Sequence, residues 1–244
     1  RKESSAASDV YKRQGEELWG RMDREPSGKS FDSLIHLEES NGIPSNPFLN
    51  TGAIILADVL IEIYGSGDAA LVKYLKLMRS VSGNSKLEID EKIYSSEKKS
   101  GHKNYAFAHY MKSFGNVFND VDEVLSLYFK FCSLKINNED LAKCFFYLSN
   151  HGVDFHGNET TSSRHCKRIN SLMFTTGTYN EVGDFAYQVG LPVKSGVSGA
   201  IAGCLPEQYS ISVWSPELNE KGNSYLGFKA LEKLTTVLDD SYLS

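Results

Sequence analysis

Residues 175–201 read TTGTYNEVGDFAYQVGLPVKSGVSGAI, and the pattern of the chain changes within this stretch. Before it and in its first half, apolar residues recur at helical spacing, over 169–174 and 185–189. After it, 200–205 and 209–214 have the composition of two β-strands joined by a short turn. An antiparallel strand pair therefore follows a series of helices.

The chain before this stretch predicts several helices. One runs from about residue 53 to 64, with Asn50 or Thr51 as N-cap and Gly65 as the C-terminal stop, and its apolar circumference indicates burial. Further helices are predicted from Asp68 to about Arg79, from Asp90, over 121–131, from Asn137 or Asn138 through Leu148, and over 223–238. We therefore predict an α+β fold with helices packed on an antiparallel sheet.

Length and composition exclude several classes of protein. The chain has 244 residues, enough for one large domain or two small ones. Its 26 Lys and Arg against 31 Asp and Glu give a net charge of −5, which argues against a nucleic-acid partner. The apolar run at 52–60 is far shorter than the roughly 20 residues of a membrane span, so we expect no membrane partner.

Cysteine and histidine usage indicates neither disulfides nor a metal. Four cysteines lie far apart with no CxxC pair, which is typical of free, mostly buried thiols in a reducing compartment: Cys132, Cys144, Cys166 and Cys204. The histidines at 151, 156 and 165 lack a further ligand at zinc spacing. The N-terminus has no apolar signal segment, so we expect a cytoplasmic protein without cofactor or metal.

Three places could carry chemistry. Lys194-Ser195-Gly196 precedes a predicted strand, and such a triplet is one mark of serine acyl-transfer enzymes, because strand N–H groups can bind an oxyanion. Tyr179 lies in a polar loop, where a tyrosine relays protons if a cation lowers its pKa, although the pattern alone is more typical of a core tyrosine. Glu97 and Asn104 lie among lysines, as on a solvated helix face.

These residues fall within stretches that occur together in one known family. Besides 175–201 they are REPSGKSFDSL (24–34), GIPSNPFLNTGAI (42–54), YSSEKKSGHKNYAFA (94–108), LYFKFCSL (127–134), LSNHG (148–152) and WSPELNEKGNS (214–224). Through these motifs the chain resembles the serine-dependent glutaminase family of the β-lactamase-like fold, over roughly residues 15–244. The resemblance implies hydrolysis of L-glutamine to L-glutamate and ammonia through a serine acyl-enzyme, without a metal or cofactor, by a homo-oligomer (a dimer or tetramer).

The resemblance also assigns four residues to substrate recognition. Asn50 matches a substrate-binding asparagine, and Glu97 matches the glutamate that receives the substrate's α-amino group. A carboxylate paired with an ammonium group is a sensible element of specificity. Asn104 matches a second binding asparagine, and Tyr128 a tyrosine near the α-carboxylate.

The remaining assignments concern the reaction. Tyr179 matches a substrate-contacting tyrosine beside the nucleophile, a candidate proton relay, and Val197 matches the residue whose backbone N–H completes the oxyanion hole. Lys194, Ser195 and Gly196 shape the supporting strand. The resemblance thus replaces the interpretations of Glu97 as surface decoration and of Tyr179 as core, while the histidines and cysteines stay structural.

The sequence departs from the family at its start. The family's nucleophile lies in a Ser-x-x-Lys motif well ahead of the EPSG segment, and residues 1–14 contain no such motif. We expect 1–14 to be a disordered or non-native tail and 15–244 a glutaminase domain incomplete at its N-terminus, lacking the first strand and the Ser-x-x-Lys helix. The chain as written should then have no glutaminase activity.

Two alternatives to a glutaminase remain open. The chain could be a natural non-catalytic relative that only binds glutamine or glutamate. It could also be another serine acyl-transferase of the same fold, such as a penicillin-binding type. Glu97 and Asn104 argue against the latter, because a clamp for an amino acid has no use there.

Overall fold

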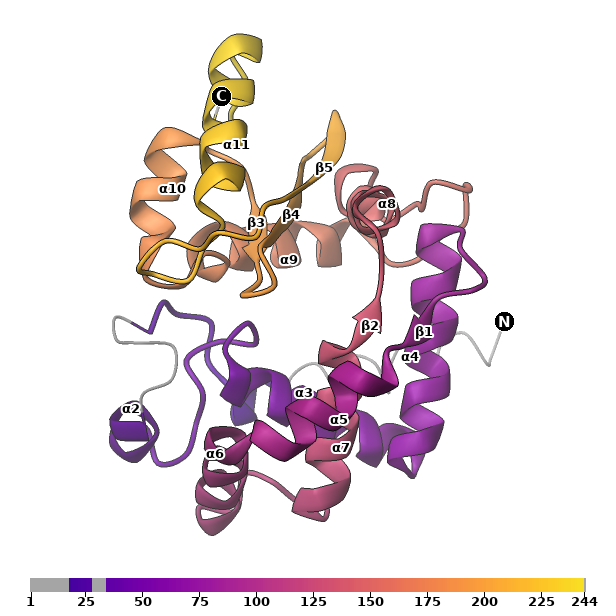
Figure 1. The fold of residues 1–244 in the computed structure, drawn as a ribbon, viewed down its shortest axis with the longest axis vertical. Helices are drawn as coiled ribbons and strands as arrows, with labels where there is room; N and C mark the ends of the chain where they lie inside the picture. The colour runs from indigo at the N-terminus through magenta and orange to yellow at the C-terminus, as the bar shows by residue number, and fades with distance from the viewer. Residues whose placement is uncertain (1–17, 28–33, 244) are drawn as a thin grey trace.

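The structure of the protein is a computed structural model, and it describes residues 18–27 and 34–243. The tail expected at 1–14 lies outside the described residues. Figure 1 shows two groups of elements, one above the other. The first comprises α2 (Leu34–Glu39), α3 (Asn50–Tyr64), α4 (Gly67–Ser82), β1 (Glu88–Ile89), α5 (Glu91–Ser100), α6 (His102–Ser113), α7 (Val121–Cys132) and β2 (Leu134–Lys135).

The second group contains the larger sheet. It comprises α8 (Asn138–Ser149), α9 (Ser163–Thr176), the 3₁₀ turn η1 (Tyr179–Glu181), α10 (Val182–Gln188), β3 (Val193–Ser195), β4 (Ala200–Leu205), β5 (Tyr209–Trp214) and α11 (Tyr225–Leu238). Between α2 and the C-terminus the chain passes once from the first group to the second, where β2 leads into α8 (Figure 1). None of the helices in the described part of the chain is long and apolar enough to cross a membrane.

Helix α3 is the buried helix that the sequence predicts, and it ends as expected. Gly65 adopts a left-handed conformation with φ 83°, and its N–H bonds to the carbonyl of Ile61. The predicted cap is wrong, because the helix begins at Asn50 itself, after Leu49, with no side-chain cap. The Asn50 side chain is thereby available to the neighbouring helix α6.

The loop before α3 approaches the helix very closely. A Cβ on Gly52 would lie 2.1 Å from the carbonyl oxygen of Asn46, so only glycine fits. The Asn46 side chain fixes the loop, because it accepts from the N–H of Phe48 at 3.0 Å and donates to the carbonyl of Glu25 at 2.9 Å. This packing sets where α3, and therefore Asn50, begins.

Three further helix starts follow from their caps. Asp90 accepts hydrogen bonds from two backbone N–H groups of α5, and Asn137 accepts one from Asp140, as predicted. The cap of α4 is Ser66 rather than the expected Asp68, which lies in the first turn, where its charge still suits the helix dipole.

The sheet confirms the predicted strand pair, and its third strand, β3, contains Lys194 and Ser195 of the expected supporting strand but not Gly196. Its antiparallel order is β3-β4-β5, with Lys194 opposite Ala202 and Ser195 opposite Ile201. Ile201 packs in one core cluster with Phe228 of α11, whereas Cys204 packs on the opposite side with helices α8 and α9. The sheet therefore lies between two helical layers.

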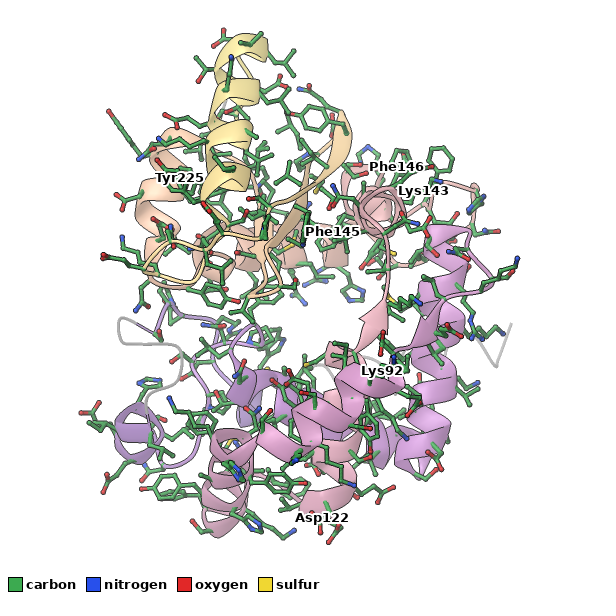
Figure 2. All side chains as sticks on the ribbon, viewed as in Figure 1. Lys92, Asp122, Lys143, Phe145, Phe146 and Tyr225 are labelled. Atoms are coloured by element: carbon green, nitrogen blue, oxygen red, sulfur yellow. The ribbon has the colours of Figure 1, made fainter. Side chains whose placement is uncertain are left out.

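Helix α8 uses one face to cover the sheet. Phe145 points from α8 toward the strands, while Lys143 and Phe146 lie farther out (Figure 2). Phe145 packs with the core cluster around Cys204, and the rings of Phe146 and Phe155 meet edge to face at 5.5 Å. The helix also contacts α4, so it joins the two groups.

The first group has a core of its own, with a buried ion pair beside it. The core is formed mainly by α3, α6 and α7, with Ile54, Phe107 and Leu125 fully buried. Beside it, Arg21 forms an ion pair with Asp58 in the middle of α3, and Asp58 is 0% exposed. This pair ties the start of the described chain to the helix that carries Asn50.

Candidate functional site

Two of the residues implied in recognition are in direct contact. Asn50, at the first position of α3, donates from Nδ2 to Oδ1 of Asn104 in α6 at 3.4 Å. Both side chains are half-buried. The contact fixes the orientation of each amide, and each amide keeps further donor or acceptor capacity for a ligand.

Glu97 lies in the last turn of α5, which Gly101 allows to approach α7 closely. A Cβ on Gly101 would lie 2.5 Å from the ring of Phe129 and 2.7 Å from the carbonyl of Glu97. The last turn of α5, with half-buried Glu97, therefore lies against α7, which carries Tyr128. The solvated face that the pattern alone predicts applies to the neighbouring lysines, Lys98 and Lys99, which are exposed.

Tyr128 lies near Glu97, Cys132 and Tyr179. It is only 6% exposed, and burial raises the pKa of its phenol, with Cys132, Glu97 and Tyr179 close enough to add to the rise. Tyr128 therefore stays protonated at neutral pH, and its hydroxyl shares a hydrogen bond with the thiol of Cys132, one helical turn away. Glu97, Tyr128 and Tyr179 are thus brought together.

Cys132 does not fit the prediction made for the cysteines. Cys144, Cys166 and Cys204 are buried as expected, but Cys132 is exposed. Protein atoms nevertheless crowd its sulfur, and this burial raises the pKa of the Cys132 thiol to about 11. The thiol is therefore protonated at neutral pH and is a hydrogen-bonding neighbour of Tyr128 rather than a nucleophile.

Tyr179 has an unusual backbone. It follows α9 through Thr178 with a φ of 54°, a left-handed conformation that a non-glycine residue rarely adopts. Its hydroxyl oxygen accepts a hydrogen bond from the backbone N–H of Val197, and the Lys194 ammonium lies 4.5 Å from the centre of its ring. Tyr179, Lys194 and Val197 therefore form one cluster.

The protonation of this cluster differs from the sequence expectation. Burial raises the pKa of Tyr179, and the hydrogen bond from Val197 only partly offsets that rise. The cation lies over the ring face rather than at the hydroxyl, so it does not create a tyrosinate. Burial lowers the pKa of Lys194 to about 8, so this amine, not the phenol, titrates near neutrality.

The three residues of the triplet Lys194-Ser195-Gly196 have different surroundings. The ammonium of Lys194 donates to the carbonyl of Ser195, whereas the Ser195 hydroxyl is fully buried on the other side of β3. The Ser195 N–H bonds to the carbonyl of Gly177 at 3.0 Å, which joins the strand to the Tyr179 loop. A Cβ on Gly196 would meet nothing nearer than 3.4 Å, so glycine leaves open surface there. Val197, next in the chain, is 60% exposed.

Ser-x-x-Lys spacing occurs three times between residues 95 and 103, on α5 and at its junction with α6. Ser95 with Lys98, Ser96 with Lys99 and Ser100 with Lys103 have this spacing, and all six side chains are exposed. A lysine that deprotonates a serine needs desolvated surroundings. These exposed pairs therefore do not form a nucleophile and its base.

The sequence patterns did not single out one group of polar residues beside the Tyr179 cluster, namely Glu181, Asn219 and Asn223. Glu181 accepts hydrogen bonds from Asn219 and Asn223, which belong to the loop after β5. The sequence contained a signal for it, since 214–224 is one of the stretches that match the family, but no role could be read from the pattern.

Comparison with known proteins identifies the family. The family model described as Glutaminase matches residues 5–242. A glutaminase of Pseudoalteromonas translucida is 47% identical over 233 residues, covering 95% of this chain and 75% of the relative. A glutaminase of Aliarcobacter butzleri is 47% identical over 224 residues, covering 91% of this chain and 72% of the relative.

Solved structures agree with this assignment. A probable glutaminase of Bacillus subtilis superposes with a TM-score of 0.87 at 32% identity, over 92% of this chain and 75% of that chain. The α+β arrangement is therefore that of the β-lactamase-like glutaminases, and the resemblance seen in the sequence motifs is confirmed. The chain belongs to the glutaminase family.

Proposed function

We propose that this protein acts on L-glutamine, with hydrolysis of the side-chain amide to L-glutamate and ammonia as its reaction. The observation that carries the proposal is the meeting of two sets of residues. Glu97 and Tyr128 come from the helical group, and Tyr179 with Val197 comes from the sheet group. Tyr128 nevertheless lies close enough to Glu97 and Tyr179 for both to raise the pKa of its phenol.

The helical residues would hold the amino-acid end of the substrate. The Glu97 carboxylate would pair with the α-ammonium, a charge-assisted contact that a neutral amide could not replace. The linked amides of Asn50 and Asn104 would orient the substrate through their remaining donors and acceptors. The protonated hydroxyl of Tyr128 would donate to the α-carboxylate.

The sheet residues would serve the reacting amide. The N–H of Val197 now points at the hydroxyl oxygen of Tyr179, so a carbonyl oxygen bound there would take the same donor as charge develops on it. Tyr179, protonated at neutral pH, would then pass its proton to the amide nitrogen, which leaves as ammonia, and would take a proton in return from the attacking hydroxyl or water. Lys194 would supply positive charge beside this phenol.

An acyl-enzyme also needs an activated serine. Lys194 and Ser195 are adjacent on a strand and point to opposite faces, so they cannot act as nucleophile and base. Within 18–27 and 34–243, we assign no serine to the role. Residues 18–27 and 34–243 taken alone would therefore bind glutamine without turning it over, and the proposed hydrolysis needs a nucleophile from outside these residues. A purely binding relative is the second candidate.

Calorimetry on the 244-residue chain tests the recognition half of the proposal. L-glutamine and L-glutamate should bind, D-glutamine should not, and E97Q should weaken L-glutamine binding by about 10- to 100-fold, because it removes the charge that pairs with the ammonium. E123Q, a change of the same chemistry on α7, is the control and should leave the affinity unchanged. Equal affinity of the wild type and E97Q would refute the assignment.

An ammonia-release assay tests the chemical half. The 244-residue chain should release no ammonia from glutamine above the uncatalysed rate, and turnover at an ordinary enzyme rate would show that the chain holds a nucleophile. Reading the coding sequence upstream of codon 15 separates the two candidates. A continuous frame with Ser-x-x-Lys favours the hydrolase, and its absence from the natural gene favours the binder.

Two further proposals concern the cellular location and the oligomeric state of the protein. We place the protein in the cytoplasm, because its four cysteines are free, as expected in a reducing compartment. We also propose a homo-oligomer, which light scattering on the purified protein would test.

A further inference from the structure

The loop after β5 folds into a tight turn against the Tyr179 cluster. Within residues 219–223, here called the asparagine turn, the N–H of Asn219 bonds to the carbonyl of Asn223 at 2.7 Å. Oδ1 of Asn219 accepts from the N–H groups of Lys221 and Asn223, each at 3.0 Å. Gly222 has a φ of 86°, and a Cβ there would contact Tyr179 at 3.9 Å and Val197 at 4.0 Å.

Glu181 fastens the asparagine turn to the loop that holds Tyr179. Its Oε2 accepts from Nδ2 of Asn219 and from Nδ2 of Asn223, both at 2.7 Å. Nδ2 of Asn223 also donates to the carbonyl of Thr178 at 3.1 Å, and Asn223 is 0% exposed. One buried amide thus holds the chain on both sides of Tyr179.

This arrangement addresses the unfavourable backbone of Tyr179. A left-handed non-glycine residue costs about 1–3 kcal/mol and persists only where its surroundings hold it. The flanking residues Thr178 and Glu181 are both tied to Asn223, so rotation of the Tyr179 backbone would break contacts on both sides. From this backbone position the phenol hydroxyl meets the N–H of Val197.

We propose that Glu181, Asn219 and Asn223 are positioning residues that hold Tyr179 in its left-handed conformation and so place its hydroxyl at the N–H of Val197. They act through Tyr179 and do not themselves touch the substrate. The effect on ligand binding rests on the proposed function, whereas the effect on Tyr179 and Val197 does not.

An exchange of donor and acceptor tests the proposal. N219D places a second carboxylate against Glu181, so the two repel each other and the turn loosens. E181Q/N219D removes this repulsion, because the new amide at position 181 donates to the carboxylate at 219, while Nδ2 of Asn223 keeps its bond to the carbonyl of Thr178. D184N is the control, since it removes only the exposed ion pair between Asp184 and Lys221 on the outer side of the same turn.

Hydrogen exchange of the Val197 amide in the unliganded chain is the first readout. N219D should speed this exchange by about tenfold relative to the Ala202 amide of β4, and E181Q/N219D and D184N should leave it near the wild-type rate. The second readout is L-glutamate affinity, which should fall about tenfold in N219D and recover in E181Q/N219D. If N219D does not fold, E181A removes the acceptor without adding a charge and should show the same effects.

The outcomes separate the two ideas. Unchanged Val197 exchange in N219D and E181A, or no recovery in E181Q/N219D, overturns the positioning role. Uniformly faster exchange of Val197 and Ala202 in N219D indicates a general loss of stability, and it overturns the role as well. A third outcome is that N219D speeds Val197 exchange as predicted while the wild-type chain binds neither L-glutamine nor L-glutamate. That result would sustain the positioning role and refute the proposed function.

Discussion

Replacing Asp58 by asparagine should destabilise the protein severely. The Asp58 carboxylate is buried and accepts from the Arg21 guanidinium, from the N–H of Phe118 at 3.0 Å, and from the N–H and Nδ2 of Asn119, each at 2.9 Å. In D58N, one carboxylate oxygen becomes an NH₂ group that faces donors. Two hydrogen bonds are then lost, and Arg21 loses its buried countercharge.

The size of the effect follows from this geometry. Breaking a buried ion pair by removing one partner costs about 3–5 kcal/mol, because the remaining charge is left without compensation. That is a large share of the roughly 5–15 kcal/mol by which folded domains are stable. For a chain of this size it corresponds to a fall in Tm of about 6–20 °C.

Urea unfolding followed by circular dichroism, with calorimetry for Tm, measures the change. E62Q is the matched control, because Glu62 accepts from the same Arg21 at 2.8 Å but is 37% exposed, and it should change the free energy of unfolding by about 1 kcal/mol or less. A D58N variant no less stable than E62Q would show that the buried pair contributes little and would refute the reasoning.

The same pair predicts a pH dependence. Burial alone would raise the pKa of Asp58, but the hydrogen bonds from Phe118, Arg21 and Asn119 outweigh it and lower the pKa. The carboxylate's contribution to stability is therefore complete above the ordinary carboxyl pKa of about 4 and is lost as pH falls through the lower folded-state value. The difference in stability between wild type and D58N should shrink over that acid range.

Two further predictions concern Lys194 and Gly52. Burial lowers the pKa of Lys194 to about 8, so between about pH 8 and pH 10 its amine is protonated in the unfolded chain but not in the folded one. As pH rises across that window, the wild type should gain up to about 3 kcal/mol of stability relative to K194M. Parallel pH profiles of the two proteins in urea unfolding would contradict this. G52A forces a Cβ against the Asn46 carbonyl, so it should lower the free energy of unfolding by about 1–3 kcal/mol or more and, by displacing Asn50, should weaken L-glutamate binding. G183A, at a helical site with open space, is the control and should be neutral or stabilising. Equal Tm values for the two variants would count against the close approach.

Much of the fold can be predicted because local chemistry decides it. The two longer strands occupy the predicted residues, 200–205 and 209–214, since their composition and the turn between them leave little choice. The caps at Asp90 and Asn137 are also local. Helix α6 was not predicted, because its first turn is polar and its start at Gly101 depends on packing against Phe129 rather than on a cap.

The site could be predicted only in part. The motifs single out the residues, and the structure brings Glu97, Tyr128, Tyr179 and Val197 together, but pattern alone favours solvent for Glu97 and the core for Tyr179. Their protonation depends on burial and on distances between elements, so the raised pKa of Tyr179 and the lowered pKa of Lys194 had no sequence signal. The exposure of Cys132 likewise depends on what packs beside α7.

The single passage of the chain from β2 to α8 has an evolutionary consequence. Of the described site residues, Asn50, Glu97, Asn104 and Tyr128 are encoded before that passage, and Tyr179, Lys194 and Val197 after it. One genetic crossover near codon 136 between two relatives would therefore exchange the four residues expected to hold the amino acid and leave the Tyr179 cluster unchanged. Selection can then adjust ligand preference without altering that cluster, provided that α4 and α8 still fit together.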